Sequence, residues 1–223
     1  MRLLPVIAAA ILVATPVYAQ ETVQGFIDAA QAARRAQDFA GAERAYAQAL
    51  GARPGDAELL TQLALVQGFQ AHYEAALATI LKAEAAAPND LDIRLAKARI
   101  LGWMTRYGEA SAALNQVLAA RPRDADALAL QGRLALYQNM PAKARDAFSR
   151  ALALDARNLD AVIGLGDAAR AAGSEQDART YYLQAQAIDP GSKDVADRLA
   201  GKANETAPKW TVSAAAGRSW LSR

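Results

Sequence analysis

The sequence predicts an all-α fold, a solenoid of stacked helix-turn-helix pairs, from three observations. Five similar segments begin 34 residues apart, at Phe39, Tyr73, Tyr107, Pro141 and Glu175. Apolar residues make up 53% of the chain and aromatic residues only 6%. Much of the apolar share is alanine, the best helix former, so this composition favours close-packed helices over sheets. Small, bulky and helix-breaking residues also recur at the same place in every segment.

The array is expected to span residues 20–192. Its five repeats are 23–56, 57–90, 91–124, 125–158 and 159–192. Positions 8 and 20 of each repeat carry small residues, so we expect two helices to cross closely there. Position 27 is alanine in four repeats and Val117 in the third. Position 20 is always alanine, namely Ala42, Ala76, Ala110, Ala144 and Ala178. Position 24 is bulky and is expected to fill the remaining space, with Tyr46, Ile80, Leu114, Phe148 and Tyr182.

The start and end of each helix can also be predicted. Position 32 is proline in four repeats, which ends the second helix of the pair because proline cannot continue it. Two residues later stand five good N-cap residues, Asp56, Asp90, Asp124, Asn158 and Ser192. A carboxylate follows in the first turn of each next helix, where the helix dipole favours it. These acids are therefore interpreted as helix starts and not as catalytic pairs.

This pattern resembles the tetratricopeptide repeat family, which has small residues at positions 8, 20 and 27, a bulky residue at 24 and proline at 32. The resemblance covers residues 23–190. It implies a right-handed solenoid in which the first helix of each repeat faces a concave surface through positions 2, 5, 9, 12 and 13. The chain departs from the family pattern at Arg94, Lys97 and Gln131, which replace apolar residues, and at Pro141 and Glu175, which replace an aromatic residue.

One candidate binding site follows from the resemblance. Position 13 carries Phe69, Trp103 and Tyr137, and position 9 carries Arg99 and Arg133, four residues before two of the aromatic rings. Residues four apart share a helix face, and a guanidinium over a ring is favourable. Two further arginines, Arg34 and Arg170, would flank this ladder, and glycines at position 12 suggest that space is wanted there.

Two interpretations of the aromatic residues remain open. The rings either pack between repeats, or they line a groove for an extended peptide or a sugar chain.

No enzyme activity, cofactor or metal site is expected. Residues 164–169, GLGDAA, match a dinucleotide-binding pattern, but that pattern requires a strand before it and Gly166 falls within a predicted helix. There is no cysteine and one histidine, His72, which leaves no thiolate or paired-histidine site. The net charge of +2 is too small to imply a nucleic-acid partner.

The two ends of the chain differ from the array. Residues 1–19 are interpreted as a signal peptide, with a basic start, an apolar run and small residues before a cut after Ala19, and no later segment is apolar for long enough to span a membrane. Residues 193–204 are expected to form a capping helix. Residues 205–223 form a linker and a tail whose apolar residues alternate as in a strand.

The expected function is an exported, periplasmic scaffold that binds a protein or peptide along its concave face. The alternative rests on the tail. It resembles the region where tetratricopeptide arrays of exopolysaccharide export proteins run into an outer-membrane barrel. The chain would then be the periplasmic arm of such a protein, with polysaccharide as a possible ligand and an association with the outer membrane.

Overall fold

The computed structural model describes residues 16–202. Within them the chain forms eleven helices: α1 (Pro16–Arg35), α2 (Phe39–Ala52), α3 (Ala57–Phe69), α4 (Tyr73–Ala86), α5 (Leu91–Trp103), α6 (Tyr107–Ala120), α7 (Ala125–Tyr137), α8 (Pro141–Leu154), α9 (Leu159–Ala171), α10 (Glu175–Ile188) and α11 (Lys193–Leu199). The tail at 205–223 and most of the expected signal peptide, up to residue 15, lie outside the described residues.

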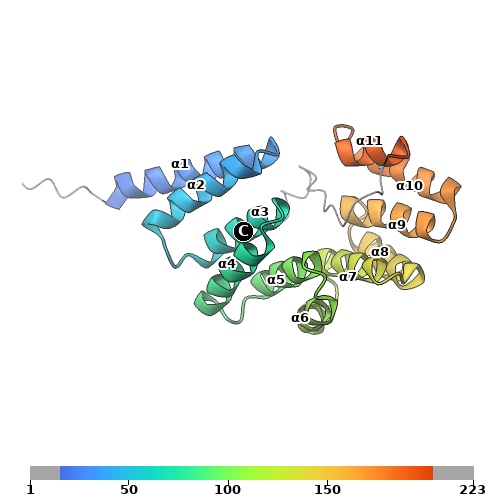
Figure 1. Cartoon of the computed structure of the whole chain (residues 1–223), viewed down its shortest axis with the longest axis horizontal. Coiled ribbons are helices and arrows are strands. Elements are labelled where there is room, and N and C mark those ends of the chain that lie inside the picture. The colour runs from blue at the N-terminus through green and yellow to red at the C-terminus, as the bar shows by residue number, and fades with distance from the viewer. Residues whose placement is uncertain (1–15, 203–223) are drawn as a thin grey trace, which may run out of the picture.

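The helices stack in chain order along an arc, with α1 and α2 at one end and α11 at the other (Figure 1). Ten of them form five pairs, one for each predicted repeat, and α11 packs on α10 beyond the last pair. The described core consists of hydrophobic clusters that each join two successive units. Stacking therefore buries what one pair could not bury alone, and the predicted solenoid is confirmed.

The small and bulky positions pack as predicted. The alanines at position 20 are fully buried in all five repeats, and the large residues at position 24 are nearly so. A Cβ atom on Gly132 would lie 2.8 Å from the ring of Phe148, and one on Gly166 would lie 2.4 Å from the ring of Tyr182. Position 8 is thus small because the position 24 side chain lies against it. Gly166 also lies in the middle of α9, which excludes the dinucleotide-binding interpretation.

The predicted N-caps are confirmed at Asp56, Asp90, Asp124, Asn158 and Ser192. The Oδ1 atom of Asp56, for example, accepts hydrogen bonds from the backbone N–H groups of Glu58 and Leu59, both at 3.1 Å. The cap before α11 begins that helix at Lys193, as predicted. Its end differs, because α11 stops at Leu199 and Gly201 takes a φ of +70°, short of the expected residue 204.

Two of the charged departures from the repeat pattern have local hydrogen-bond partners. The Nζ atom of Lys97 in the third repeat donates a hydrogen bond of 2.7 Å to Glu84 in the second repeat. Arg94 donates to the backbone carbonyl of Pro88 at 2.9 Å. Both side chains keep part of their surface in water, so the helix packing tolerates them.

The turn inside each helix pair has a residue in the left-handed backbone conformation, always at the same position of the repeat. At position 15 the φ angle is positive in all five repeats, at Gln37, Ala71, Thr105, Asn139 and Gly173. In the second repeat, the N–H of Ala71 donates to the carbonyl of Gly68 and the N–H of His72 to that of Gln67, the pattern of a helix C-terminal motif. Only the fifth repeat has the glycine that this conformation favours.

Thr105→Gly is therefore expected to stabilise the array by about 1 kcal/mol, because a β-branched residue at a φ of 60° is sterically strained. Urea unfolding followed by circular dichroism would measure the change. The matched control is Gly173→Thr, which should lower the free energy of unfolding by a similar amount. Equal stability of Thr105→Gly and the parent chain would contradict the turn geometry.

Candidate functional site

Trp103, the central ring of the predicted ladder, lies in the core between the second and third repeats. It is 4% exposed and belongs to a hydrophobic cluster with residues of α3 and α4. A Cβ atom on Gly68 would lie 2.0 Å from a carbon of the Trp103 ring. The glycine at position 12 thus makes room for the ring of the next repeat and not for a ligand. The prediction that Trp103 lines an open groove is corrected for this physical reason.

The other two rings pair across repeats but keep part of their surface exposed. Phe69 lies 5.3 Å from Phe39 and 5.1 Å from Trp103, centroid to centroid. Tyr137 lies 6.0 Å from Tyr107. The position 17 aromatic residue of one repeat thus meets the position 13 residue of the next. This pairing favours packing between repeats as the main role of the ladder, and it leaves no continuous row of three open rings for a sugar chain.

Two of the four predicted arginines serve the structure. Arg133 is 8% exposed, and its Nη1 atom donates to Oδ2 of Asp167 at 2.8 Å. Its guanidinium lies over the ring of Phe148, 5.7 Å from the ring centroid. Arg170 lies over the ring of Tyr182 at 4.8 Å and donates to the backbone carbonyl of Arg198 at 3.0 Å.

The remaining two arginines are partly exposed. Arg34 donates to the side-chain oxygen of Gln62 at 2.6 Å, which links the first and second repeats. Arg99 projects from α5 close to Asp126 of α7. Burial raises the pKa of Asp126, and Arg99 opposes that rise.

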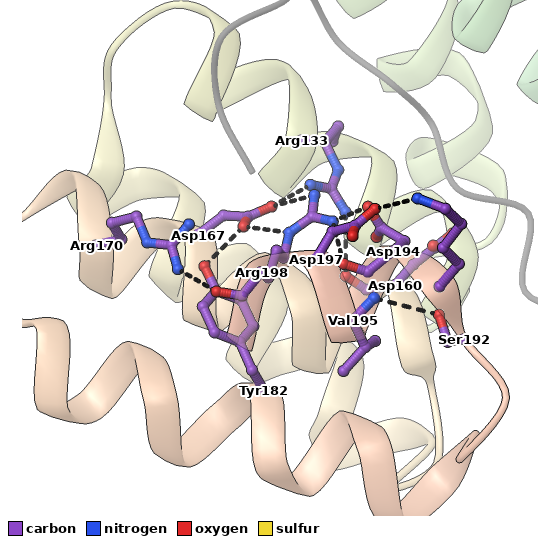
Figure 2. Close-up of polar contacts among 11 residues, drawn as sticks. Arg133, Asp160, Asp167, Arg170, Tyr182, Ser192, Asp194, Val195, Asp197 and Arg198 are labelled. Carbon is purple, nitrogen blue, oxygen red and sulfur yellow. Dashed lines mark hydrogen bonds and ion pairs between the residues drawn. The ribbon is translucent and has the colours of Figure 1, made fainter. Parts of the chain in front are cut away.

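A buried ionic network joins the last two repeats to α11, and it was not foreseen from the sequence (Figure 2). Asp167 of α9 is its centre. It accepts hydrogen bonds from Arg133 of α7, from Arg198 of α11 at 2.8 and 3.2 Å, and from the hydroxyl of Tyr182 of α10 at 2.9 Å. Arg198 also pairs with Asp194 within α11. One carboxylate therefore ties together four helices.

The charges of this network depend on one another. Burial alone would raise the pKa of Asp167, but Arg133 and Arg198 lower it below its ordinary value. Burial alone would likewise lower the pKa of Arg198, and Asp167 and Asp194 raise it instead. The pKa of Tyr182 is raised by burial and by Asp167, so its hydroxyl stays a donor. The only hint in the sequence was position 9, which changes from arginine in two repeats to Asp167 in the fifth.

The network occupies the inner face of the last repeat, so the accessible part of the predicted site lies on α3, α5 and α7. We define the inner surface as Leu65, Phe69, Arg99, Asp126 and Tyr137. All five are partly exposed. They combine apolar rings and an aliphatic side chain with one cation and one carboxylate.

Comparison with known proteins identifies the repeats. The profile of a tetratricopeptide repeat family matches residues 129–193, which hold most of α7 and all of α8 to α10. These residues hold tetratricopeptide repeats. No curated protein matches the chain.

Solved structures show the same tetratricopeptide fold. A thermophilic tetratricopeptide-repeat protein of Thermus thermophilus superposes with a TM-score of 0.70 at 20% identity, covering 82% of this chain and 97% of that one. PilW, a widely conserved type IV pilus biogenesis factor, gives a TM-score of 0.62 at 22% identity, covering 82% and 85%. MamA of Desulfovibrio magneticus RS-1 gives 0.54 at 20% identity, covering 78% and 98%.

A tetratricopeptide array is typical of a non-enzymatic scaffold that binds other proteins. Among residues 16–202, no helix has the length and apolar character that crossing a membrane requires. The same residues hold no group of three histidine or acidic side chains that could bind a metal ion.

Proposed function

We propose that this tetratricopeptide array is an exported, non-catalytic scaffold that binds an extended segment of a partner protein on its inner surface. Export is inferred from residues 1–19, whose basic start, apolar run and Val17-Tyr18-Ala19 ending are those of a cleaved signal peptide. Cleavage there would place the chain in the periplasm and leave α1 with residues 20–35.

The proposed site rests on the composition of the inner surface. The inner face of the last repeat is not part of it, because the network around Asp167 occupies that face. Leu65, Phe69 and Tyr137 offer partly exposed apolar area on the first helices of the second and fourth repeats. Arg99 lies among them and could donate two parallel hydrogen bonds to a carboxylate of the partner. A segment with an apolar side chain next to an acidic one fits this surface best.

Site-specific photo-crosslinking would test the proposal in the exported protein. A photoreactive residue at position 65 should form an adduct with one partner, and Arg99→Gln should lower its yield about tenfold, because a charge-assisted hydrogen bond is lost. Intact mass should show a chain that starts at Gln20. The matched control is the same photoreactive residue at Leu81 of α4, which is 44% exposed and outside the inner surface.

Equal adduct yields from positions 65 and 81 would contradict the proposed surface. A soluble form that keeps residues 1–19 would contradict the proposed export. The two outcomes are independent, so each part of the proposal can fail separately.

A further inference from the structure

A cavity of about 640 Å³ lies between α6, α7 and α8, where the third repeat meets the fourth. Its inner wall contains the buried side chains of Leu114, Leu134 and Ala135. Its rim is polar and includes Ser111, Asn115, Gln131 and Lys143. The cavity is open to solvent on one side, since Asn115 and Lys143 are exposed.

The cavity exists because two facing positions are small at this interface. At the first two interfaces of the array, position 21 of one repeat meets position 11 of the next with larger side chains. Glu43 accepts a hydrogen bond from Gln67 between the first two repeats, and Leu77 packs in the cluster of Leu101 between the next two. The equivalent pair here is Ser111 and Ala135, which leaves the space between them unfilled.

The cavity is separate from the inner surface. On α7 its wall is formed by Gln131, Leu134, Ala135 and Gln138, which share one helix face. Arg133 and Tyr137 lie roughly 130° away around the same helix axis, at 100° per residue. A ligand in the cavity would therefore approach α7 from nearly the opposite side to a partner on the inner surface.

The polar groups of the rim are available for a ligand. Asn115, Gln131, Ser111 and Lys143 make no side-chain hydrogen bond or ion pair with the described part of the chain, in contrast to Gln67 and Gln70 at the first interface, which both donate to Glu43. A side-chain amide carries both a donor and an acceptor, which matches the N–H and C=O of a peptide main chain. Gln131 is also the residue that departs from the apolar repeat pattern without a local partner.

We propose that this cavity binds a short extended peptide segment. The side chains of Asn115 and Gln131 pair with its main chain, and an aliphatic side chain of the peptide enters the space against Leu114 and Leu134. The wall from Gln131 to Gln138 runs roughly 10 Å along α7, which is the length of about three extended residues.

The charges of the rim select the sequence of the segment. Lys143 and Arg150 face the cavity with one acid, Asp146, whose pair with Arg150 is loose at 3.9 Å. The rim is therefore net positive, and an acidic residue beside the aliphatic one is favoured.

Nuclear magnetic resonance of the full chain would test this site with a defined probe, the blocked pentapeptide acetyl-Gly-Glu-Leu-Gly-Gly-amide. The side-chain amide signals of Asn115 and Gln131 should shift saturably. The peptide with lysine in place of glutamate should bind at least about tenfold more weakly, because the rim is positive. Equal binding of the two peptides would overturn the charge assignment. The absence of a saturable shift at millimolar peptide would overturn the site.

Two variants complete the test. Ser111→Leu with Ala135→Leu reproduces the Leu77 and Leu101 pair of the preceding interface, so it should close the gap between positions 111 and 135, keep the fold and abolish binding. Gln131→Leu introduces at position 7 the leucine that the second and fifth repeats carry there, Leu63 and Leu165. It should weaken binding at least about tenfold, because the hydrogen bonds from the Gln131 amide are lost. Leu183→Ser, at an exposed site on α10, is the control and should bind as the parent chain does. Undiminished binding by the filled variant or by Gln131→Leu would overturn the proposal.

Discussion

Trp103→Ala is expected to lower the free energy of unfolding by about 3–5 kcal/mol, the usual cost of removing a large ring from a core. The ring is 4% exposed, lies edge-on to Phe69 and occupies the space above Gly68. The surrounding helices can collapse only partly into the cavity that it leaves. Urea unfolding followed by circular dichroism would measure the loss, provided that the slope with urea stays constant.

A double-mutant cycle with Gly68→Ala sharpens this test. In the parent chain a methyl group at position 68 would overlap the Trp103 ring, so Gly68→Ala alone should destabilise. In the Trp103→Ala background the same methyl group enters vacant space, so its cost should largely disappear. The exposed Leu183, 48% accessible, supplies a control, since Leu183→Ala should change stability by less than about 0.5 kcal/mol. Additive effects of the two core changes would mean that the ring does not lie over Gly68.

Asp167→Asn is expected to destabilise the chain by about 3–5 kcal/mol, because it leaves the buried cations Arg133 and Arg198 without their shared carboxylate. The loss should be largest at α11, which Arg198 anchors. Hydrogen exchange would show it as lost protection of the amides from Val195 to Ala200. The control is Asp146→Asn, since that carboxylate is exposed and its pair with Arg150 is 3.9 Å long. Undisturbed protection of α11 in Asp167→Asn would contradict the network.

The same network predicts a dependence of stability on pH. The pKa of Asp167 is lower in the folded chain than its ordinary value, because Arg133 and Arg198 outweigh the effect of burial. Its contribution is therefore complete above the unfolded pKa, near about 3.9, and is lost as the pH falls through the folded pKa. The parent chain should lose stability in this range, and Asp167→Asn should lose less. Parallel pH profiles of the two chains would contradict the assignment.

The repeat architecture could be predicted because each of its determinants is local and recurs five times. Asp56 and its equivalents cap helices through their own neighbours in the chain, and the alanines at position 20 share a helix face with the bulky residue four positions later. A single lapse in the pattern, such as Gln131, is outweighed by agreement in the other repeats. The export signal is read from composition in the same way and stays a prediction, since residues 1–15 lie outside the described structure.

The candidate site could be predicted only in part. Position 13 lies at the boundary between the inner face of a helix and its contact with the neighbouring repeat. A residue at this position can therefore be either a groove residue or a core residue, and its place in the repeat does not distinguish the two. The glycine at position 68 showed that space is needed there. The pattern alone does not show whether a ligand or Trp103 fills that space. Phe69, Tyr137 and Arg99 stay candidates because the structure leaves them partly exposed.

The sequence by itself thus determined a helical solenoid of five tetratricopeptide repeats, its helix starts and its buried small residues, since these depend on spacing along one chain. Only the tertiary structure decided which side chains meet across repeats. It placed Trp103 over Gly68, gathered Arg133, Tyr182 and Arg198 around Asp167, and left a cavity between Ser111 and Ala135. Those contacts depend on the angle at which successive helix pairs stack, and no short-range pattern of residues specifies that angle.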